Sequence, residues 1–194
     1  MVSDTNISCF GLANGSVGVI GAGGTGAYTF MWSPGGQTTS HLSGLSTGTY
    51  TVTLTDSKGC TDVDSAIIAE PAVLSGTVSG INVSCNGNAD GQASIAPTGG
   101  TAPFSYNWLP GGETTAGISN LAPGSYTISL SDSLGCSHLD SVTITSPAVL
   151  SQTLSVSDGI DCKGSATGAL SAAVGGGTGP YTYNWSPGGA TSSS

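Results

Sequence analysis

The sequence predicts an all-β protein made of tandem immunoglobulin-like β-sandwich domains of about 76 residues, with roughly seven strands each. A segment running from a glycine cluster, through an aromatic strand ending in Trp, to a Pro-Gly-Gly turn occurs three times. Its tryptophans, Trp32, Trp108 and Trp185, recur at intervals of 76 and 77 residues. A long fixed period indicates that each repeat is one folding unit. Apolar and polar residues alternate over short runs, and the 32 Gly and 9 Pro favour turns over helices.

The second repeat contains the clearest strands, taken in order along the chain. Apolar residues alternate with polar ones over 91–98, 104–108, 126–131 and 142–144. The segments 45–50 and 121–126 have the form L-x-x-G-x-Y, which is typical of a tyrosine corner at the end of a cross-sheet loop. We therefore expect the core to contain Trp32, Trp108, Trp185, Tyr50 and Tyr126.

The expected domains are repeat 1 over 1–71, repeat 2 over 72–147 and a truncated repeat 3 over 148–194. The joins EPAVLS (70–75) and SPAVLS (146–151) are nearly identical and too short for a flexible spacer. They predict restricted hinges, with neighbouring repeats as partners. Repeat 3 lacks a second Cys and the L-x-x-G-x-Y strand, so Trp185 should be poorly ordered or buried by another chain. Met1 is expected to open an excised fragment.

Composition excludes several partners. Charged residues make up 7% of the chain, and two Lys, no Arg and a net charge of -9 exclude nucleic acid and anionic membrane surfaces. No apolar run approaches the ~18–20 residues that span a bilayer, which predicts no membrane insertion. Neither His41 nor His138 recurs between repeats, and no catalytic constellation does, so we expect no enzyme and no cofactor.

The five cysteines recur with the repeat, which predicts disulfides in an oxidising compartment. Cys9, Cys85 and Cys162 share one position of the repeat, whereas Cys60 and Cys136 share another. The favoured pairing is Cys9–Cys60 and Cys85–Cys136, which brackets one Trp in each repeat and leaves Cys162 unpaired. The alternative, Cys60–Cys85 and Cys136–Cys162, would leave Cys9 unpaired and shift the domain boundaries.

These residues resemble the SprB repeat, found in very large surface adhesins of the phylum Bacteroidota. The resemblance rests on CNGNADG (85–91), GGTAPFSYNW (99–108) and LAPGSYTISLSDSLGC (121–136), with matching segments in repeat 1 and a match through Trp185 in repeat 3. It implies export by the type IX secretion system, display at the cell surface, a role in adhesion and, in gliding organisms, in motility. The corresponding expectation is a non-enzymatic stalk or adhesin shaft.

Two other functions remain open on the sequence alone. A glycan-binding module would need exposed aromatic residues in a concave patch, whereas the alternating aromatics of each repeat are expected to be core. A filament subunit would complete repeat 3 with strands from a neighbouring chain. Surface glycans and other copies of the chain are therefore candidate partners.

Three further motifs have a site interpretation and a structural one. Asn86, Asn88 and Asp90 resemble the start of a calcium loop, but Pro97 stands where the bidentate Glu belongs, so an Asn/Asp-Gly turn is expected. Asp56 and Asp132 recur in D-S-x-G-C, where an Asx-type turn would present the second Cys. The D-S-apolar triplets at Ser65, Ser133 and Ser141 resemble O-glycosylation acceptors of Bacteroidota and would need exposed hydroxyls.

Overall fold

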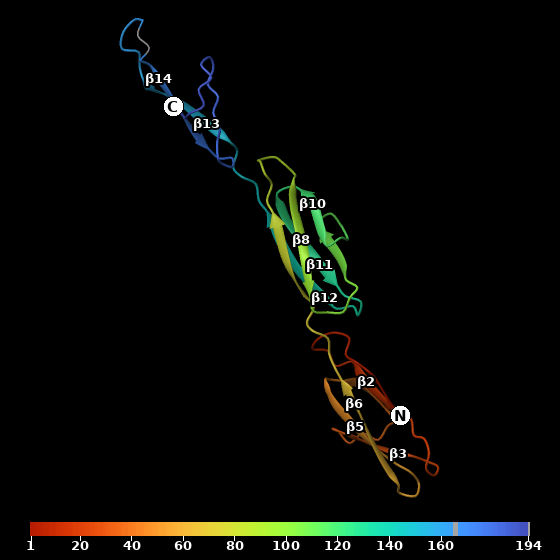
Figure 1. Ribbon diagram of the computed structural model, residues 1–194. Helices are drawn as coiled ribbons and strands as arrows, with labels where there is room; N and C mark the ends of the chain where they lie inside the picture. Colours follow the sequence, from red (N-terminus) through yellow and green to blue (C-terminus); the bar gives the residue numbers. More distant parts are fainter. Residues whose placement is uncertain (165–166, 194) are drawn as a thin grey trace. The chain divides into compact units, whose positions relative to one another are not determined.

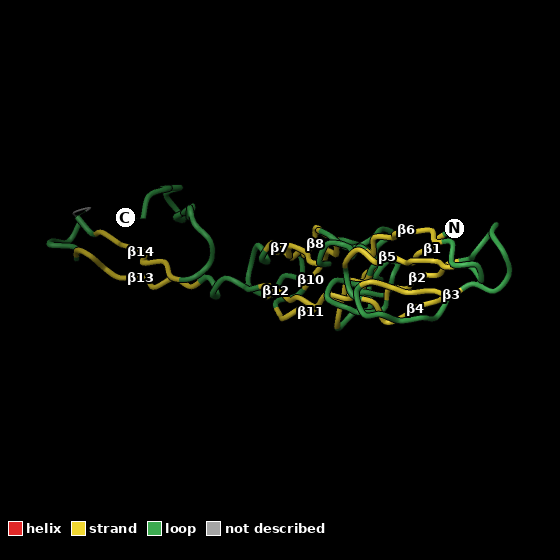
Figure 2. Tube along the Cα trace, turned by 90° about the horizontal axis from the view of Figure 1, so that it is seen from below, coloured by secondary structure: helices red, strands yellow, loops and turns green. Residues whose placement is uncertain are grey.

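The computed structural model describes residues 1–164 and 167–193, and these residues form strands, turns and loops without a helix (Figures 1 and 2). Repeat 1 forms six strands. Their bounds are β1 (Val2–Thr5), β2 (Gly15–Val19), β3 (Thr29–Ser33), β4 (His41–Leu45), β5 (Gly48–Thr55) and β6 (Thr61–Ile68). Roughly seven strands were expected in each repeat, and repeat 1 has six; the glycine cluster at 21–26 forms an irregular loop.

Repeat 1 is a sandwich of two three-stranded antiparallel sheets. Their orders are β1-β2-β4 and β3-β5-β6. Trp32 on β3 lies opposite Val52 on the central strand β5, and both are buried. The core gathers the inward positions of both sheets, namely Ile7, Val17, Val19, Trp32, Leu42, Leu45, Val52, Ala66 and Ile68.

Repeat 2 forms the same six elements. They are β7 (Ser75–Ile81), β8 (Gly91–Thr98), β9 (Ser105–Leu109), β10 (Gly117–Leu121), β11 (Gly124–Ser131) and β12 (Ser137–Ile144). The sheet orders β10-β8-β7 and β12-β11-β9 match those of repeat 1 element for element. Trp108, Ile128 and Leu130 are fully buried. The all-β, tandem immunoglobulin-like fold expected from the alternation is therefore confirmed.

Repeat 3 contributes one antiparallel hairpin, β13 (Ser151–Asp158) and β14 (Ala169–Gly175). The segment with Tyr181, Tyr183 and Trp185 follows as irregular chain where the other repeats have β3 and β9. Trp185 is half-buried, whereas Trp32 and Trp108 are 1% and 0% exposed. Burial of this tryptophan by another chain stays a prediction.

Contacts divide the chain into two compact units that do not coincide with the sequence repeats. The first unit comprises Met1–Thr77, Ala96–Asn107 and Ile128–Asp140, and the second comprises Val78–Ile95, Trp108–Thr127 and Ser141–Ser194. The join between repeats 1 and 2 thus lies inside the first unit, and the join between repeats 2 and 3 lies inside the second.

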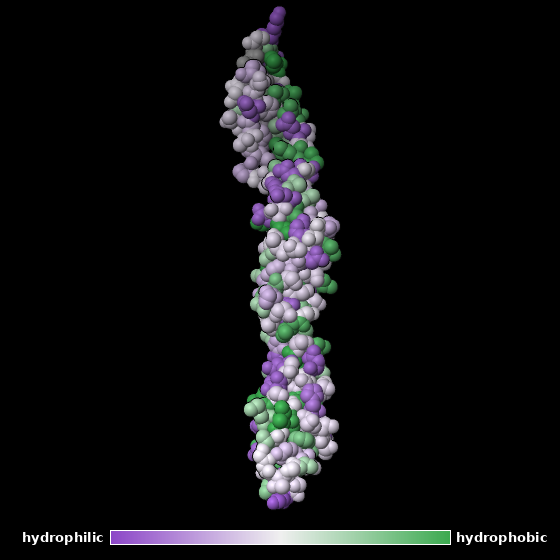
Figure 3. Space-filling model, turned by 90° about the vertical axis from the view of Figure 1, so that its right-hand side faces the viewer, coloured by the Kyte–Doolittle hydropathy of each residue, from purple (hydrophilic) through white to green (hydrophobic). Residues whose placement is uncertain are grey.

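The surface reflects the scarcity of charge in the sequence. On the face in Figure 3, most side chains are of intermediate hydropathy, and strongly hydrophilic ones are scattered among them. Among the described residues, no helix has the length and apolarity required to cross a membrane.

Candidate functional site: the joins between repeats

Each tryptophan is held by the Pro-Gly-Gly turn that follows it. In repeat 2, Trp108 donates its backbone N–H to Glu113 O at 2.9 Å and its indole Nε1–H to Thr115 O at 3.0 Å. Gly112, with a φ of 78° that favours glycine, donates its N–H back to Trp108 O at 2.6 Å. The equivalent bonds occur at Trp32 and at Trp185, whose Nε1–H donates to Ser192 O at 2.8 Å. The hydrogen bonds between each tryptophan and the turn after it therefore form independently of the core, since they are present even where the tryptophan is half-buried.

The β11–β12 turn is organised by one carboxylate, as the recurrence of D-S-x-G-C indicated. Asp132 Oδ1 accepts the backbone N–H groups of Leu134 and Cys136 at 3.0 and 2.9 Å. Asp132 Oδ2 accepts the N–H of Thr101 at 2.9 Å, and Ser133 Oγ donates to Thr101 O at 2.9 Å. The turn is thereby fixed against the segment that follows the glycine pair of repeat 2.

The equivalent turn of repeat 1 has the same construction. Asp56 accepts the N–H groups of Lys58, Cys60 and Thr25 at 2.9, 2.9 and 3.0 Å. The hydrogen bond from the Cys60 N–H, followed by that from Thr25, lowers the pKa of Asp56. Burial raises the pKa of Asp132, but the four backbone hydrogen bonds outweigh it and lower the pKa below its ordinary value of 3.8.

A pair of glycines in each later repeat holds the preceding join. Gly100 donates its N–H to Ala72 O at 3.0 Å, and Gly177 donates to Ala148 O at 2.8 Å. A Cβ on Gly99 would lie 2.0 Å from Val73 O, and one on Gly176 would lie 2.0 Å from Val149 O. Side chains at these two positions would collide with the join. We call Gly99–Gly100 and Gly176–Gly177 the join cradles; the threefold recurrence of Gly-Gly-Thr is the sequence signal that could have identified them.

The loop with the first Cys of each repeat lies at the end where the chain leaves that repeat. In repeat 1, Ile7 donates its N–H to Ala69 O at 3.0 Å, and Gly11 donates to the Glu70 carboxylate at 2.9 Å. In repeat 2, Val83 donates its N–H to Thr145 O at 3.2 Å. Residues 69 and 145 immediately follow the last strand of their repeats. Cys9 and Cys85 therefore lie beside the exit.

The structure contains a disulfide between Cys9 and Cys136, with Cα atoms 5.6 Å apart and a sequence separation of 127. The expected pairs Cys9–Cys60 and Cys85–Cys136 are therefore wrong, and so is the alternative that assigned Cys136 to Cys162. Cys60 and Cys85 are exposed thiols. Cys162, expected to be unpaired, is exposed and is not in the bond that the structure contains.

Strand length explains why the expected pairing fails. Cys60 precedes β6, whereas Cys9 lies near Ala69, which follows β6. A strand of eight residues spans about 25 Å, but disulfide geometry requires Cα atoms within about 7 Å. The two cysteines of one repeat thus lie at opposite ends of its sandwich. The exit-side Cys of repeat 1 bonds instead to the turn Cys of repeat 2.

The other residues singled out in the sequence have structural contacts. Tyr50 and Tyr126 are half-buried, and their hydroxyls donate to Ser46 O and Ala122 O at 3.1 and 2.9 Å, which is the tyrosine-corner contact. Asn88 and Asp90 both bond Ser84, whereas Asn86 donates to Pro147 O at 3.1 Å. The three calcium-loop candidates thus brace the loop and the join. Among the described residues, no group of three or more His, Cys, Asp or Glu side chains is placed to hold a metal.

The candidate acceptor serines differ in their surroundings. Ser65 on β6 and Ser141 on β12 are exposed. Ser133 is exposed as well, but its hydroxyl donates to Thr101 O and Ala102 O at 2.9 and 3.2 Å. A glycan on Ser133 would remove those two hydrogen bonds.

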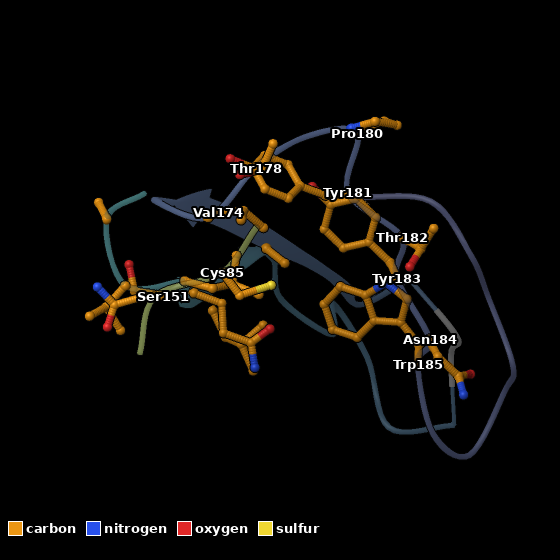
Figure 4. A pocket seen from close by; sticks show the side chains of 18 of the residues that line it. Cys85, Ser151, Val174, Thr178, Pro180, Tyr181, Thr182, Tyr183, Asn184 and Trp185 are labelled. Atoms are coloured by element: carbon orange, nitrogen blue, oxygen red, sulfur yellow. The ribbon is translucent and has the colours of Figure 1, made fainter. Parts of the chain in front are cut away.

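A pocket of about 1000 Å³ lies at the join between repeats 2 and 3 (Figure 4). Cys85, Leu150 and Thr178 line it together with the aromatic residues Tyr181, Tyr183 and Trp185. In Figure 4 the sulfur of Cys85 points towards the part of the pocket where Tyr183 and Trp185 lie.

Comparison with known proteins identifies the repeat. A family model described as "SprB repeat" matches residues 2–37, 77–113 and 154–190. No curated protein matches the chain. Among solved structures, "Structure of amphioxus IgVJ-C2 molecule" is 15% identical, with a TM-score of 0.33 and coverage of 74% of this chain and 96% of that one.

A second similar structure contains the C-terminal fragment of intimin in complex with the intimin-binding domain of the translocated intimin receptor. It is 13% identical, with a TM-score of 0.39, and covers 72% of this chain and 59% of that one.

Proposed function

Because the chain belongs to the SprB repeat family, we propose that it is a non-enzymatic shaft segment of a bacterial surface adhesin. The observation that carries the proposal is the Cys9–Cys136 disulfide, which links consecutive repeats through their facing turns. A stalk must transmit tension between its ends, and a covalent bond across a join transmits it without relying on noncovalent packing.

The bond also removes most of two repeats from the path of tension. Force applied to the chain ends passes from Cys9 to Cys136 through the sulfurs. The 127-residue stretch between them, whose extended length is about 430 Å, carries no load while the bond is intact. Unfolding of either core under load therefore cannot lengthen the shaft by that amount.

The join cradles add to this role. Gly100 and Gly177 each donate a hydrogen bond to the join that precedes them. A join held in this way has fewer conformations than a free linker, which suits a shaft that must keep its reach. The low charge is compatible with the same role, because a shaft needs no charged site for a ligand.

The proposal includes a location at the cell surface, which the disulfide supports. Structural disulfides persist in oxidising surroundings outside the cytoplasm. Export by the type IX system, adhesion and participation in gliding are the finer parts of the proposal, supported by the family alone. Treatment of intact cells with a protease should remove the repeats if they are displayed, and protection equal to that of a cytoplasmic marker would contradict the location.

Single-molecule stretching of the 194-residue chain tests the shaft. The final contour length should be about 430 Å shorter in the oxidised protein than in the reduced one. A variant with Cys9→Ser and Cys136→Ser is the matched control and should behave like the reduced protein without reductant. Equal contour lengths for oxidised and reduced wild-type protein would reject the proposal.

A glycan-binding module is the second candidate, favoured by one observation. The pocket at the join between repeats 2 and 3 has three aromatic residues, Tyr181, Tyr183 and Trp185, on which a sugar ring could stack. The equivalent tryptophans in repeats 1 and 2 are fully buried, so this surface would be core in a complete repeat. Binding on a glycan array that is lost in Trp185→Ala, and not in Phe10→Ala at an exposed aromatic residue elsewhere, would favour this candidate.

A further inference from the structure

We propose that the Cys9–Cys136 bond is one member of a series of bonds between consecutive repeats. In this series Cys85 bonds to the D-S-x-G-C hairpin of a repeat that follows in the same polypeptide. Cys60 correspondingly bonds to the exit-side Cys of a repeat that precedes it. The inference goes beyond the proposed shaft function, because it assigns bonding partners to the exposed thiols of Cys60 and Cys85. It does not depend on what the shaft adheres to.

The loops of Cys9 and Cys85 are built alike. Leu12 donates its N–H to Cys9 O at 3.1 Å, and Asn88 donates to Cys85 O at 3.1 Å. Both loops attach at the exit of their own repeat, as described above. Only their surroundings differ, because the bonded Cys9 is half-buried whereas Cys85 is exposed.

The pocket beside Cys85 has the features that receive the hairpin in repeat 2. Thr101, which binds Asp132 and Ser133, corresponds to Thr178 in the pocket wall. Leu74 in the first join is 7% exposed, whereas its counterpart Leu150 lines the pocket and is 61% exposed. The pocket therefore combines the counterparts of three residues at the first join: Leu150 for Leu74, Thr178 for Thr101 and Cys85 for Cys9.

The occupant follows from this match. A hairpin with Asp directly after its first strand and Cys four residues after that Asp would accept the Thr178 N–H with its carboxylate, as Asp132 accepts that of Thr101. The strands that precede and follow such a turn would cover Trp185, as β11 and β12 complete the sheet that contains Trp108. In this way one segment fills the pocket and presents its thiol to Cys85.

Formation of the bond needs a disulfide oxidant, either oxidised glutathione or an oxidoreductase disulfide. The Cys85 thiolate attacks one sulfur of the oxidant, forming a mixed disulfide and releasing the first thiolate. The hairpin thiolate then attacks the Cys85 sulfur, forming the new S–S bond and releasing the second thiolate. The two cysteines together lose two electrons and two protons, and the oxidant is reduced to two thiols.

The series would give the shaft two interleaved covalent paths. One path uses bonds such as Cys9–Cys136. The other enters repeat 1 at Cys60, crosses the first join and leaves repeat 2 at Cys85, and these 25 positions extend to about 85 Å. Every sandwich core would then be bypassed by at least one path, so the shaft would resist lengthening at every repeat.

The test appends a second copy of residues 118–147 directly after Ser194, which completes repeat 3 in register with repeat 2. The copy has Leu134→Val as a mass marker. The protein is oxidised in a glutathione redox buffer, and its disulfides are mapped by mass spectrometry without reduction. We expect Cys9–Cys136 to persist and Cys85 to bond to the Cys of the copy, with loss of Cys85 alkylation and loss of the acrylamide-quenchable Trp185 fluorescence.

A control copy with Cys136→Ser should restore Cys85 alkylation and keep Trp185 shielded, which separates the bond from pocket filling. A bond between the Cys of the copy and Cys162 would overturn the proposal, because it would place both within one repeat. Continued alkylation of Cys85 in the extended chain would also overturn it. So would disulfide-linked dimers through Cys85, since these would identify another chain as the source. None of these outcomes depends on adhesion or on the stretching result.

Discussion

The Asp132 carboxylate accepts a 2.9 Å hydrogen bond from the backbone N–H of Thr101, which lies 31 residues earlier in the chain. The same carboxylate accepts the N–H of Cys136. One side chain thus connects the glycine pair that holds the join with the cysteine that bonds across it.

Asp132→Asn should weaken both contacts, because the amide nitrogen in place of Oδ2 cannot accept the Thr101 N–H and the uncharged amide oxygen is a weaker acceptor for the Cys136 N–H. We expect repeat 2 to lose about 2 kcal/mol of unfolding free energy, the scale of hydrogen bonds to a buried charged group. The Cys9–Cys136 bond should form more slowly in a glutathione buffer. Urea denaturation and timed alkylation measure the two effects. The control, Asp56→Asn, changes the equivalent turn and should leave the rate of bond formation unaltered.

Acid should destabilise the protein through the same carboxylates. The folded-state pKa values of Asp56, Asp90 and Asp132 are lowered below 3.8, so folding favours their charged forms. Their contribution is present in full above the unfolded pKa and is lost as the pH falls through the lower folded values. The melting temperature should therefore be steady from neutral pH to about 5 and fall below about pH 4. Calorimetry of a triple Asp→Asn variant should give a flatter profile, and an equally steep one would contradict this assignment.

Trp108→Ala and Trp185→Ala test the difference in burial between the repeats. Trp108 is 0% exposed, and removing it should cost repeat 2 about 3–5 kcal/mol because it leaves a large cavity in the core. Trp185 is half-buried beside the pocket, and its removal should cost about 1 kcal/mol or less. Thermal unfolding followed by circular dichroism compares them. Similar losses would show that Trp185 packs as a core residue.

Gly99→Ala should disrupt the join cradle. The added Cβ would lie 2.0 Å from Val73 O, on a residue whose φ is already 65°. Gly23→Ala is a matched control, because Gly23 has a φ of 77° and no atom within 4 Å of the added Cβ. Both variants have the strain of a left-handed alanine, about 1 kcal/mol, but only Gly99→Ala should displace the join. Slower Cys9–Cys136 formation in Gly99→Ala alone is the expected result, and equal rates would show that the cradle does not position the join.

If the native protein is O-glycosylated, a glycan should be found on the exposed Ser65 and be absent from Ser133. The reason is that the Ser133 hydroxyl donates hydrogen bonds to Thr101 O and Ala102 O, which a glycosidic oxygen cannot do. Glycopeptide mapping of protein from its native host distinguishes the three serines. A glycan found on Ser133 would mean that the turn detaches from the Thr101 segment. A native mass free of sugar increments would remove the glycosylation hypothesis altogether.

Features that depend on near neighbours in the chain can be predicted from the sequence alone. Alternation of side chains sets the inward faces of β5 and β11, and the turn after each tryptophan closes within seven residues, so it forms even in repeat 3. The tyrosine corner closes over four residues for the same reason. Such contacts follow from backbone geometry and need no knowledge of the rest of the fold.

Which cysteines meet depends on the tertiary structure, and the sequence does not show it. Spacing identified Cys9 and Cys60 as recurrent positions, but spacing does not indicate at which end of a sandwich each one lies. The eight-residue strand β6 separates them, and the join brings Cys136 of the next repeat to Cys9 instead. A disulfide forms where two Cα atoms approach to within a few ångströms, and that proximity depends on how whole strands and joins are placed in space.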